Sequence, residues 1–359
     1  MHYLAMSFVS SFQKMANADR DHVAIDMEEM LANAQPLFTT ECCIYEVPYE
    51  IRRLNEDAYT PHLVSIGPLH HGDPKLLSME GHKKVYCQYF LKRSREISLD
   101  NVVSCLRELE PRIRRSYSKN IELGVDEFIK VILVDCGFII ELLIRYYNFM
   151  ETDHDIIRKP WLLEKIRYDL LLLENQIPFF VLEKLWDLAF QSSLFNGDNS
   201  LSLLELASCY LCPTERIVFE SSIRVAHFTD MNRIFCLKPF KRNLLRTNEV
   251  PTLHYSASEL HEAGVKFKVN REEKSLLELK FSGKCLQVPE IEVDDGTETW
   301  FRNMVALEQC HYLEESYITD YVIFIGHLVN EGKDVDVLVK NKIIVNRLGF
   351  SEALGEISW

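Results

Sequence analysis

The chain has 359 residues and carries 40 Lys and Arg against 54 Asp and Glu, a formal net charge of −14. It is 47% hydrophobic with 13 Gly and 12 Pro, which is typical of a folded globular protein and excludes a disordered or fibrous chain. General nucleic-acid binders need excess cations to displace the counterions of the phosphates. We therefore predict no nucleic-acid partner.

The first part of the chain shows weak periodicity. We predict a weakly ordered N-terminal segment at 1–41, which contains a short helix at 27–34. Residues 42–72 are punctuated by Pro and Gly, which predicts loops and short turns laid over the rest of the fold. From 42 to 359 we predict a single domain.

The middle of the chain predicts a helical core at about 80–190. Residues 125–147 are apolar around nearly the whole helical circumference, which is typical of the central helix of a large core. A loop-rich region is expected at 191–255. The predicted helices of the core lie at 80–95 and 102–117, at 125–147, and as two helices in 160–190 broken by Pro178.

The periodicity then changes from helical to alternating. Residues 265–269 and 277–281 alternate apolar and charged residues, which predicts strands, and 286–293 is a candidate third strand. We therefore predict a mainly α fold, a large helical body with a small antiparallel β-sheet insert near 265–293. C-terminal helices are expected within 299–345, at 299–312, 317–330 and 334–345.

The ten cysteines favour a reducing compartment over a disulfide framework. Several lie at apolar helical positions, where a thiol behaves as a small hydrophobic group, and the chain is too large to need disulfides. There is no Asn-x-Ser/Thr sequon, and no stretch reaches the roughly 20 apolar residues of a membrane-spanning helix. We predict a cytoplasmic protein.

Asp135 is the most unusual single residue, because its helical neighbours are all apolar. A buried carboxylate must be paired or protonated, and a perturbed acid is either catalytic or structural. We favour a structural acid bonded to the backbone or to an Arg. The triplet 174–176 allows the same two interpretations, and for it we favour helix capping at the Pro178 break.

A His-rich stretch is the strongest metal candidate, with His62, His70, His71 and His82 near Asp73. Its spacing fits no ligand template, so we favour histidines that order a turn and predict no metal and no cofactor. Cys209 and Cys212 form a lone C-x-x-C, which lacks the second pair of a structural zinc site. The catalytic candidates are Asp135, His70, His71 and His82.

Residues 83–119 carry ten Lys or Arg and four Asp or Glu. One interpretation is a surface patch for anionic lipid or an acidic partner. The alternative, which we favour, is that these basic helices face the acidic stretch 286–299 within the fold. The candidate anion-binding residues are Lys83, Lys84, Lys92, Arg93, Arg95, Arg112, Arg114 and Arg115.

Six blocks in chain order carry a family resemblance: CIYEVP (43–48), VSIGPLHHG (64–72), LVDCGFIIEL (133–142), DLLLLENQIPFF (169–180), LHYSASEL (253–260) and ALEQC (306–310). Together they resemble the plant "domain of unknown function 247" family. The resemblance implies a cytosol-facing globular region, usually with a hydrophobic C-terminal anchor. Some members are implicated in recognition, including the pollen side of grass self-incompatibility, and no catalytic mechanism is established.

These observations lead to one main hypothesis and two alternatives. The main hypothesis is a non-enzymatic recognition or signalling protein with an unknown protein partner. One form of this hypothesis places the protein at the cytosolic side of the plasma membrane. The chain stops at Trp359 without the usual anchor, so we expect no transmembrane segment in it. The alternatives are a hydrolase or transferase using His70–His82 with an acid, and a peripheral binder of anionic lipid.

Overall fold

The computed structural model describes residues 22–32, 40–94, 98–148, 156–190, 202–212, 223–237, 253–270 and 277–348. The chain divides into two compact units, residues 1–40 and 41–359. In the first unit, helix α2 (His22–Ala32) begins earlier than the helix predicted at 27–34. Its apolar side chains Val23, Met27 and Met30 are exposed. Everything that follows concerns the second unit.

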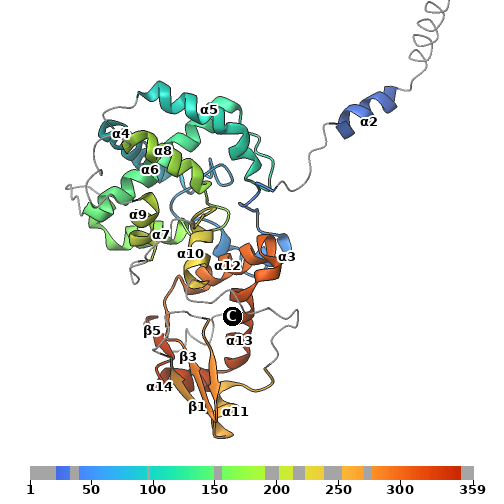
Figure 1. Ribbon diagram of the computed structural model, residues 1–359, viewed down its shortest axis with the longest axis vertical. Helices are drawn as coiled ribbons and strands as arrows, with labels where there is room; N and C mark the ends of the chain where they lie inside the picture. The colour runs from blue at the N-terminus through green and yellow to red at the C-terminus, as the bar shows by residue number, and fades with distance from the viewer. Residues whose placement is uncertain are drawn as a thin grey trace, which may run out of the picture. The chain divides into compact units, whose positions relative to one another are not determined.

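A body of helices forms the N-terminal part of the second unit (Figure 1). The helices predicted at 80–95, 102–117, 125–147 and within 160–190 are confirmed, with ends shifted by a few residues. The elements are α3 (Tyr49–Arg52), η1 (Asp57–Tyr59), η2 (Leu77–Met79), α4 (Glu80–Arg93), α5 (Leu99–Arg115), α6 (Val125–Asn148), η3 (Ile156–Arg158), α7 (Pro160–Asp169), α8 (Phe179–Phe190), α9 (Leu203–Leu211) and α10 (Phe228–Leu237).

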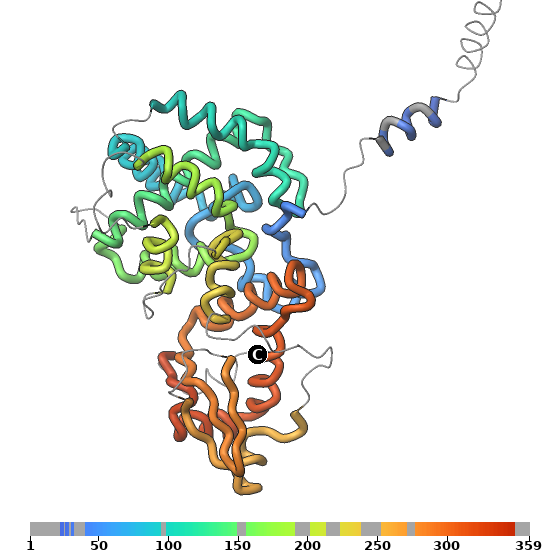
Figure 2. The backbone as a smooth tube through the Cα atoms, viewed as in Figure 1, coloured from blue at the N-terminus to red at the C-terminus, as the bar shows by residue number. Residues whose placement is uncertain are grey.

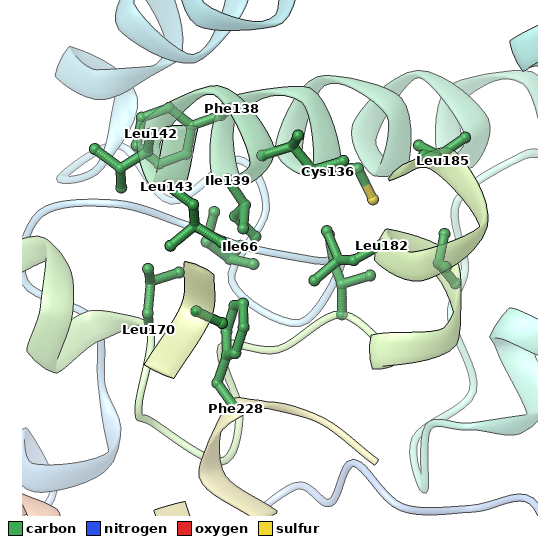
Figure 3. Packing of buried hydrophobic residues seen from close by; sticks show 14 of the residues in the cluster. Ile66, Cys136, Phe138, Ile139, Leu142, Leu143, Leu170, Leu182, Leu185 and Phe228 are labelled. Atoms are coloured by element: carbon green, nitrogen blue, oxygen red, sulfur yellow. The ribbon is translucent and has the colours of Figure 1, made fainter. Parts of the chain in front are cut away.

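Helix α6 is the central helix of this body, as its all-round apolar pattern predicts. Sixteen of its residues are buried, including Phe138, Ile139 and Leu142. Helix α4 approaches it so closely that a Cβ atom on Gly137 would lie 2.7 Å from Sγ of Cys87. Figure 3 shows how side chains of α6 and α8 converge with Leu170 and Phe228 in this core.

The prediction that the segment 42–72 lies over the fold is wrong for two of its stretches, around residue 44 and at residues 64–67, whereas residues 48–57 between them are exposed or half-buried. Ile44, Val64 and Ile66 are buried members of the main hydrophobic cluster. The tube in Figure 2 shows this blue stretch running among the green helices. These two stretches are irregular yet interior, so their backbone polar groups need partners from elsewhere in the chain.

A second hydrophobic cluster lies in the C-terminal part, which combines short strands with helices. The prediction of mainly α structure with a small β insert is confirmed. The elements are α11 (Ala257–Glu262), β1 (Lys266–Val269), β2 (Lys280–Ser282), β3 (Cys285–Val288), β4 (Ile291–Val293), α12 (Thr297–His311), η4 (Leu313–Glu315), α13 (Tyr317–Leu328), α14 (Gly332–Lys340) and β5 (Ile344–Asn346).

The insert is not a purely antiparallel sheet. The first sheet has the order β1-β3-β2, in which β2 and β3 are antiparallel but β1 and β3 are parallel. The stretch 286–293 divides at Pro289, so β4 leaves this sheet and pairs in parallel with β5. The alternation of side chains defines which face is buried but not the direction of a strand, so the sequence pattern could not separate these topologies.

Two further predictions are corrected by the observed elements. The range 191–255, expected to be loop-rich, contains α9 and α10. The last predicted helix, 334–345, ends early, because residues 344–346 form strand β5. No helix in the described ranges is both long and apolar enough to cross a membrane. All ten cysteines lie within the described ranges, and none of them forms a disulfide bond there.

Candidate functional site

A buried ion pair joins α4 to α6 beneath the irregular segment. The ammonium of Lys83 lies 2.6 Å from Oδ1 of Asp135, and both side chains are 1% exposed. A second carboxylate, that of Glu80, lies 2.6 Å from the same ammonium. Burial raises the pKa of Asp135 to about 6, although Lys83 opposes this shift. Burial opposes the charge of Lys83, yet the two carboxylates raise its pKa, so the pair is charged at neutral pH.

This pair holds the backbone of the buried segment at two points. Lys83 donates a hydrogen bond to the carbonyl oxygen of Ser65 at 2.8 Å, and the Gly67 amide donates to Oδ2 of Asp135 at 2.9 Å. The structural interpretation of Asp135 fits these contacts, with Lys83 in place of the expected Arg. At 1% exposure the carboxylate is enclosed by the chain, so its contacts fix a loop in place.

Two side chains, one from the last residue of α7 and one from the loop after it, bind further backbone groups of the buried segment. The carboxylate of Asp169 accepts hydrogen bonds from three consecutive backbone amides, those of residues 62, 63 and 64, at 2.8–3.0 Å. Burial raises its pKa, and the three amides oppose that rise. Asn175 accepts from the Ile66 amide at 2.7 Å and donates to the Val64 carbonyl at 2.9 Å, which mimics a strand partner.

Gly67 occupies a position in the buried segment that no residue with a side chain fits. Its φ is +72°, and a Cβ atom there would collide with the backbone oxygen of Gln176. The hydroxyl of Tyr117 donates to that same oxygen at 2.9 Å and would lie 3.1 Å from the added carbon. The chain therefore passes Gln176 at a distance that only a residue without a side chain allows.

Glu174 binds the preceding part of the segment. It accepts hydrogen bonds from the Val47 amide and from Arg52, both at 2.7 Å, and lies 3.1 Å from Nε2 of His70. Although burial opposes ionisation, these three donors lower the pKa of Glu174. The predicted capping role at the Pro178 break is therefore wrong for Glu174, which stabilises a distant loop.

The third member of the triplet does act at a helix end, but not at the predicted one. Oε1 of Gln176 accepts from the amide of Phe228, the first residue of α10, at 3.0 Å. Its amide nitrogen donates to the carbonyls of Leu170 and Leu172 at 2.6 and 2.7 Å. Gln176 thus connects the end of α7 to the beginning of α10.

The three candidate histidines occupy different environments. His70 contacts Glu174, His71 is half-buried in the turn, and His82 is exposed on α4. Asp135 instead contacts Lys83. Within the described ranges no group of three or more His, Cys, Asp or Glu residues is placed to hold a metal ion. In the C-x-x-C, Sγ of Cys212 contacts Oδ1 of Asn232 at 3.2 Å.

Most cations of the candidate anion-binding patch have partners within the fold. Lys83 is buried against Asp135, and Arg93 binds Glu141 through two hydrogen bonds at 2.8 and 3.0 Å. Arg114 binds Glu110 and two backbone carbonyls, and lies over the ring of Phe128. Arg115 lies 2.5 Å and Arg112 3.9 Å from Glu41, while Lys84 and Lys92 are exposed and Arg95 lies outside the described residues.

The acidic stretch 286–299 pairs elsewhere than expected. Its Glu292 binds Arg347 and its Glu298 binds Arg302, at 3.0 and 2.7 Å. The acids that contact the basic helices come from α4, α5, α6 and Glu41. The basic helices are therefore paired with acids within the fold, but not with the acids of the stretch 286–299.

A second buried ion pair was missed by sequence reasoning. Arg233 on α10 lies 3.1 Å from Glu308 on α12. The carboxylate of Glu308 also accepts from the amides of Ile318 and Thr319 at the start of α13. Burial raises the pKa of Glu308 against these donors. The apolar spacing of Phe228, Met231 and Phe235 was the signal that could have revealed α10 and thus this Arg.

His227, which immediately precedes α10, was also missed by sequence reasoning. It is 0% exposed, its Nε2 donates to the Cys43 carbonyl at 3.0 Å, and its Nδ1 lies 3.4 Å from the Asp230 amide. Burial lowers the pKa of His227 to about 4, so the ring is neutral at physiological pH. The carboxylate of Asp230 in turn accepts from the hydroxyl of Tyr312 at 2.8 Å. These bonds join the segment at residue 43 to α10 and α12.

An apolar groove lies at the surface where residues 50–59 meet α12 and α13. Its volume is about 290 Å³. Asn55 donates to Glu298 and Asn303 donates to the Ala58 carbonyl, which fixes the two walls together. Charged side chains at the groove are Glu50, Glu298 and Arg302. The apolar lining consists of Ile51, Leu54, Tyr59, Phe301, Val305 and Val322.

Comparison with known proteins decides the family. The family model described as a plant protein of unknown function, domain of unknown function 247, matches residues 44–357. This chain belongs to that family. The chain is 30% identical to the UPF0481 protein At3g47200 of Arabidopsis thaliana over 95% of its length and 76% of the relative. It is 24% identical to the putative UPF0481 protein At3g02645 of the same plant, over 88% and 77%. No solved structure matches the chain.

The blocks that carry the resemblance to the domain of unknown function 247 family meet in space. The block 64–72 supplies the buried segment, 133–142 supplies Asp135, and 169–180 supplies Asp169 and Asn175. The polar side chains of Asp135, Asp169 and Asn175 in these blocks therefore bond to the chain's own backbone. In this chain they build a buried scaffold around residues 64–67.

Proposed function

We propose that this chain is a non-enzymatic recognition or signalling interaction protein, working in the cytoplasm at or near the cytosolic side of the plasma membrane. The observation that carries the proposal is the internal use of three buried carboxylates, one of them that of the catalytic candidate Asp135. The carboxylates of Asp135, Asp169 and Glu174 accept hydrogen bonds from backbone amides of one loop. Residues used in this way support a rigid scaffold.

The cysteines support the proposed compartment. All ten lie within the described ranges, where none is joined to another by a disulfide bond. Burial raises the pKa of Cys43 and Cys87 to about 12, so these thiols are unreactive structural groups. Thiols in such number suit a reducing compartment better than a secreted protein. The kinship with plant proteins supports a partner from a plant cell.

The test is chemical cross-linking in plant tissue followed by purification of the tagged full chain. We expect a defined partner that is absent from tissue expressing the tag alone. Turnover of a substrate by the purified chain would overturn the proposal if Asp135→Asn abolished it while the far-UV circular dichroism and the melting temperature stayed at those of a folded protein. Binding to anionic vesicles that is lost in Lys84→Ala/Lys92→Ala would favour the lipid alternative instead.

A further inference from the structure

The groove described above combines an exposed apolar wall with a buried floor. Leu54 is 66% exposed, whereas Tyr59 and Phe301 beneath it are buried. A large exposed apolar side chain next to a hollow is a common feature of protein interaction sites. The volume of about 290 Å³ lies at the lower limit of pockets for small molecules, which span about 300–1,000 Å³. It suits a few inserted side chains better than a cofactor.

The elements that form the groove are acidic. Residues 49–59 and 297–328 contain eight Asp or Glu, three Arg and no Lys, a formal charge of −5. Each of the three Arg already has a carboxylate partner. Arg52 binds Glu174, Arg53 binds Glu50 and Arg302 binds Glu298, at 2.6–2.7 Å. Of the eight acids, Glu308 is buried and paired with Arg233. The exposed acids of these elements are Glu56, Asp57, Glu314 and Glu315, of which Glu56 lies 3.7 Å from Arg52 and Glu315 lies 3.9 Å from Arg233.

We propose that this groove binds a basic amphipathic helix of a partner protein. The helix would place one or two large apolar residues, spaced i and i+3 or i+4, against Leu54 and Val305. Its flanking Lys or Arg residues would face the acids of α3, η1 and η4. An anionic membrane does not fit this site, because its surface potential has the same sign as the acidic elements. The inference rests on the proposed function and specifies the chemistry of the partner.

The test uses two display libraries of helix-stabilised peptides with identical apolar positions. One library carries Lys and Arg at the flanking positions, and the other carries Asp and Glu. Against the purified full chain, we expect binders from the basic library alone. Their affinity should fall about tenfold or more in Leu54→Ala, because burial of one Leu side chain is lost. The matched control is Leu77→Ala, which removes a 54% exposed Leu that does not line the groove.

Leu54 is exposed, so its replacement leaves the fold intact, which far-UV circular dichroism checks. Hydrogen exchange should slow in residues 49–59 and in α12 when a peptide binds. Recovery of acidic peptides, no binders from either library, or binders that are indifferent to Leu54→Ala would each overturn the groove assignment. The proposed function fails separately, when cross-linking in tissue recovers no specific partner.

Discussion

Replacement of Lys83 by Met tests whether the buried ion pair supports the fold. The variant fills the same volume but leaves the carboxylate of Asp135 without its cation at 1% exposure. Removal of one partner from a buried pair typically costs about 3–5 kcal/mol, because the remaining charge is uncompensated. The carbonyl of Ser65 also loses its donor. We expect Lys83→Met to lower the free energy of unfolding by about 3–5 kcal/mol.

The double variant Lys83→Met/Asp135→Asn separates the charge from the hydrogen bonds. The side-chain amide introduced at position 135 is neutral and still offers an oxygen to the Gly67 amide, so the uncompensated charge disappears. The unpartnered Ser65 carbonyl remains, and such a group costs about 1–3 kcal/mol. The double variant should therefore be more stable than Lys83→Met. The cost of Lys83→Met alone should shrink as the pH falls, because a protonated Asp135 needs no cation.

The assay is urea-induced unfolding at about pH 7.5, followed by far-UV circular dichroism. Lys84→Met is the matched control, since Lys84 is the exposed neighbour and its change should stay within about 0.5 kcal/mol. Equal stability of the single and double variants would refute the argument that buried charge dominates. So would a cost below about 1 kcal/mol for Lys83→Met.

Three further predictions concern the same scaffold. Gly67→Ala should lower the free energy of unfolding by at least about 2 kcal/mol, because φ is +72° and the new methyl group meets the Gln176 oxygen. Asn175→Ala should cost about 3 kcal/mol and accelerate hydrogen exchange at the Ile66 amide, which loses its acceptor. The stability advantage of the wild type over His227→Gln should fall by about 3 kcal/mol between about pH 7 and pH 4.

The sign of the last effect follows from the pKa of His227. It is about 4 in the folded chain and about 6.5 when unfolded, so the unfolded chain takes up the proton first. The contribution is complete above about pH 6.5 and is lost as the pH falls towards 4. Subtraction of the His227→Gln profile removes groups common to both proteins. A flat difference between these two pH values would contradict the assignment of a buried neutral ring.

The two backbone predictions have their own controls. Gly81→Ala should leave stability unchanged or raise it slightly, because a Cβ atom there meets no neighbour and the residue lies in α4. If Gly67→Ala behaved like Gly81→Ala, the close passage of the buried segment would be wrong. For Asn175→Ala, unchanged exchange at the Ile66 amide would show that the side chain does not hold the segment.

The long helices could be predicted because their pattern is local. Helix α6 occupies Val125–Asn148 against the predicted 125–147, since an apolar circumference over so many turns has few alternatives. Helix α10 was not predicted because it has only ten residues and irregular sequence on both sides. The parallel pairing of β1 with β3 could not be predicted either, because the pattern along a strand carries no information about its neighbours.

The contacts of the candidate site could likewise be predicted only in part. That Asp135 needs a partner followed from its apolar neighbours, but the choice of Lys83 depended on how α4 lies against α6. The interior position of residues 64–67 could not be predicted, because the neighbouring Pro and Gly residues suggest an exposed loop. The side chains of Asp169 and Asn175, 105 and 109 positions away from the amides that they bind, are what allow this backbone to be buried.

That separation has a consequence for the order of events during synthesis. The amides of Val64 and Ile66 find their acceptors 105 and 109 positions downstream. At about 5–20 residues per second, a ribosome needs roughly 5–20 s to deliver those acceptors. Until then the motif around Gly67 cannot complete its hydrogen bonds, and the apolar residues around it have no finished core. We therefore expect the nascent chain to expose apolar side chains and unpaired backbone amides during that interval, the surface that chaperones recognise.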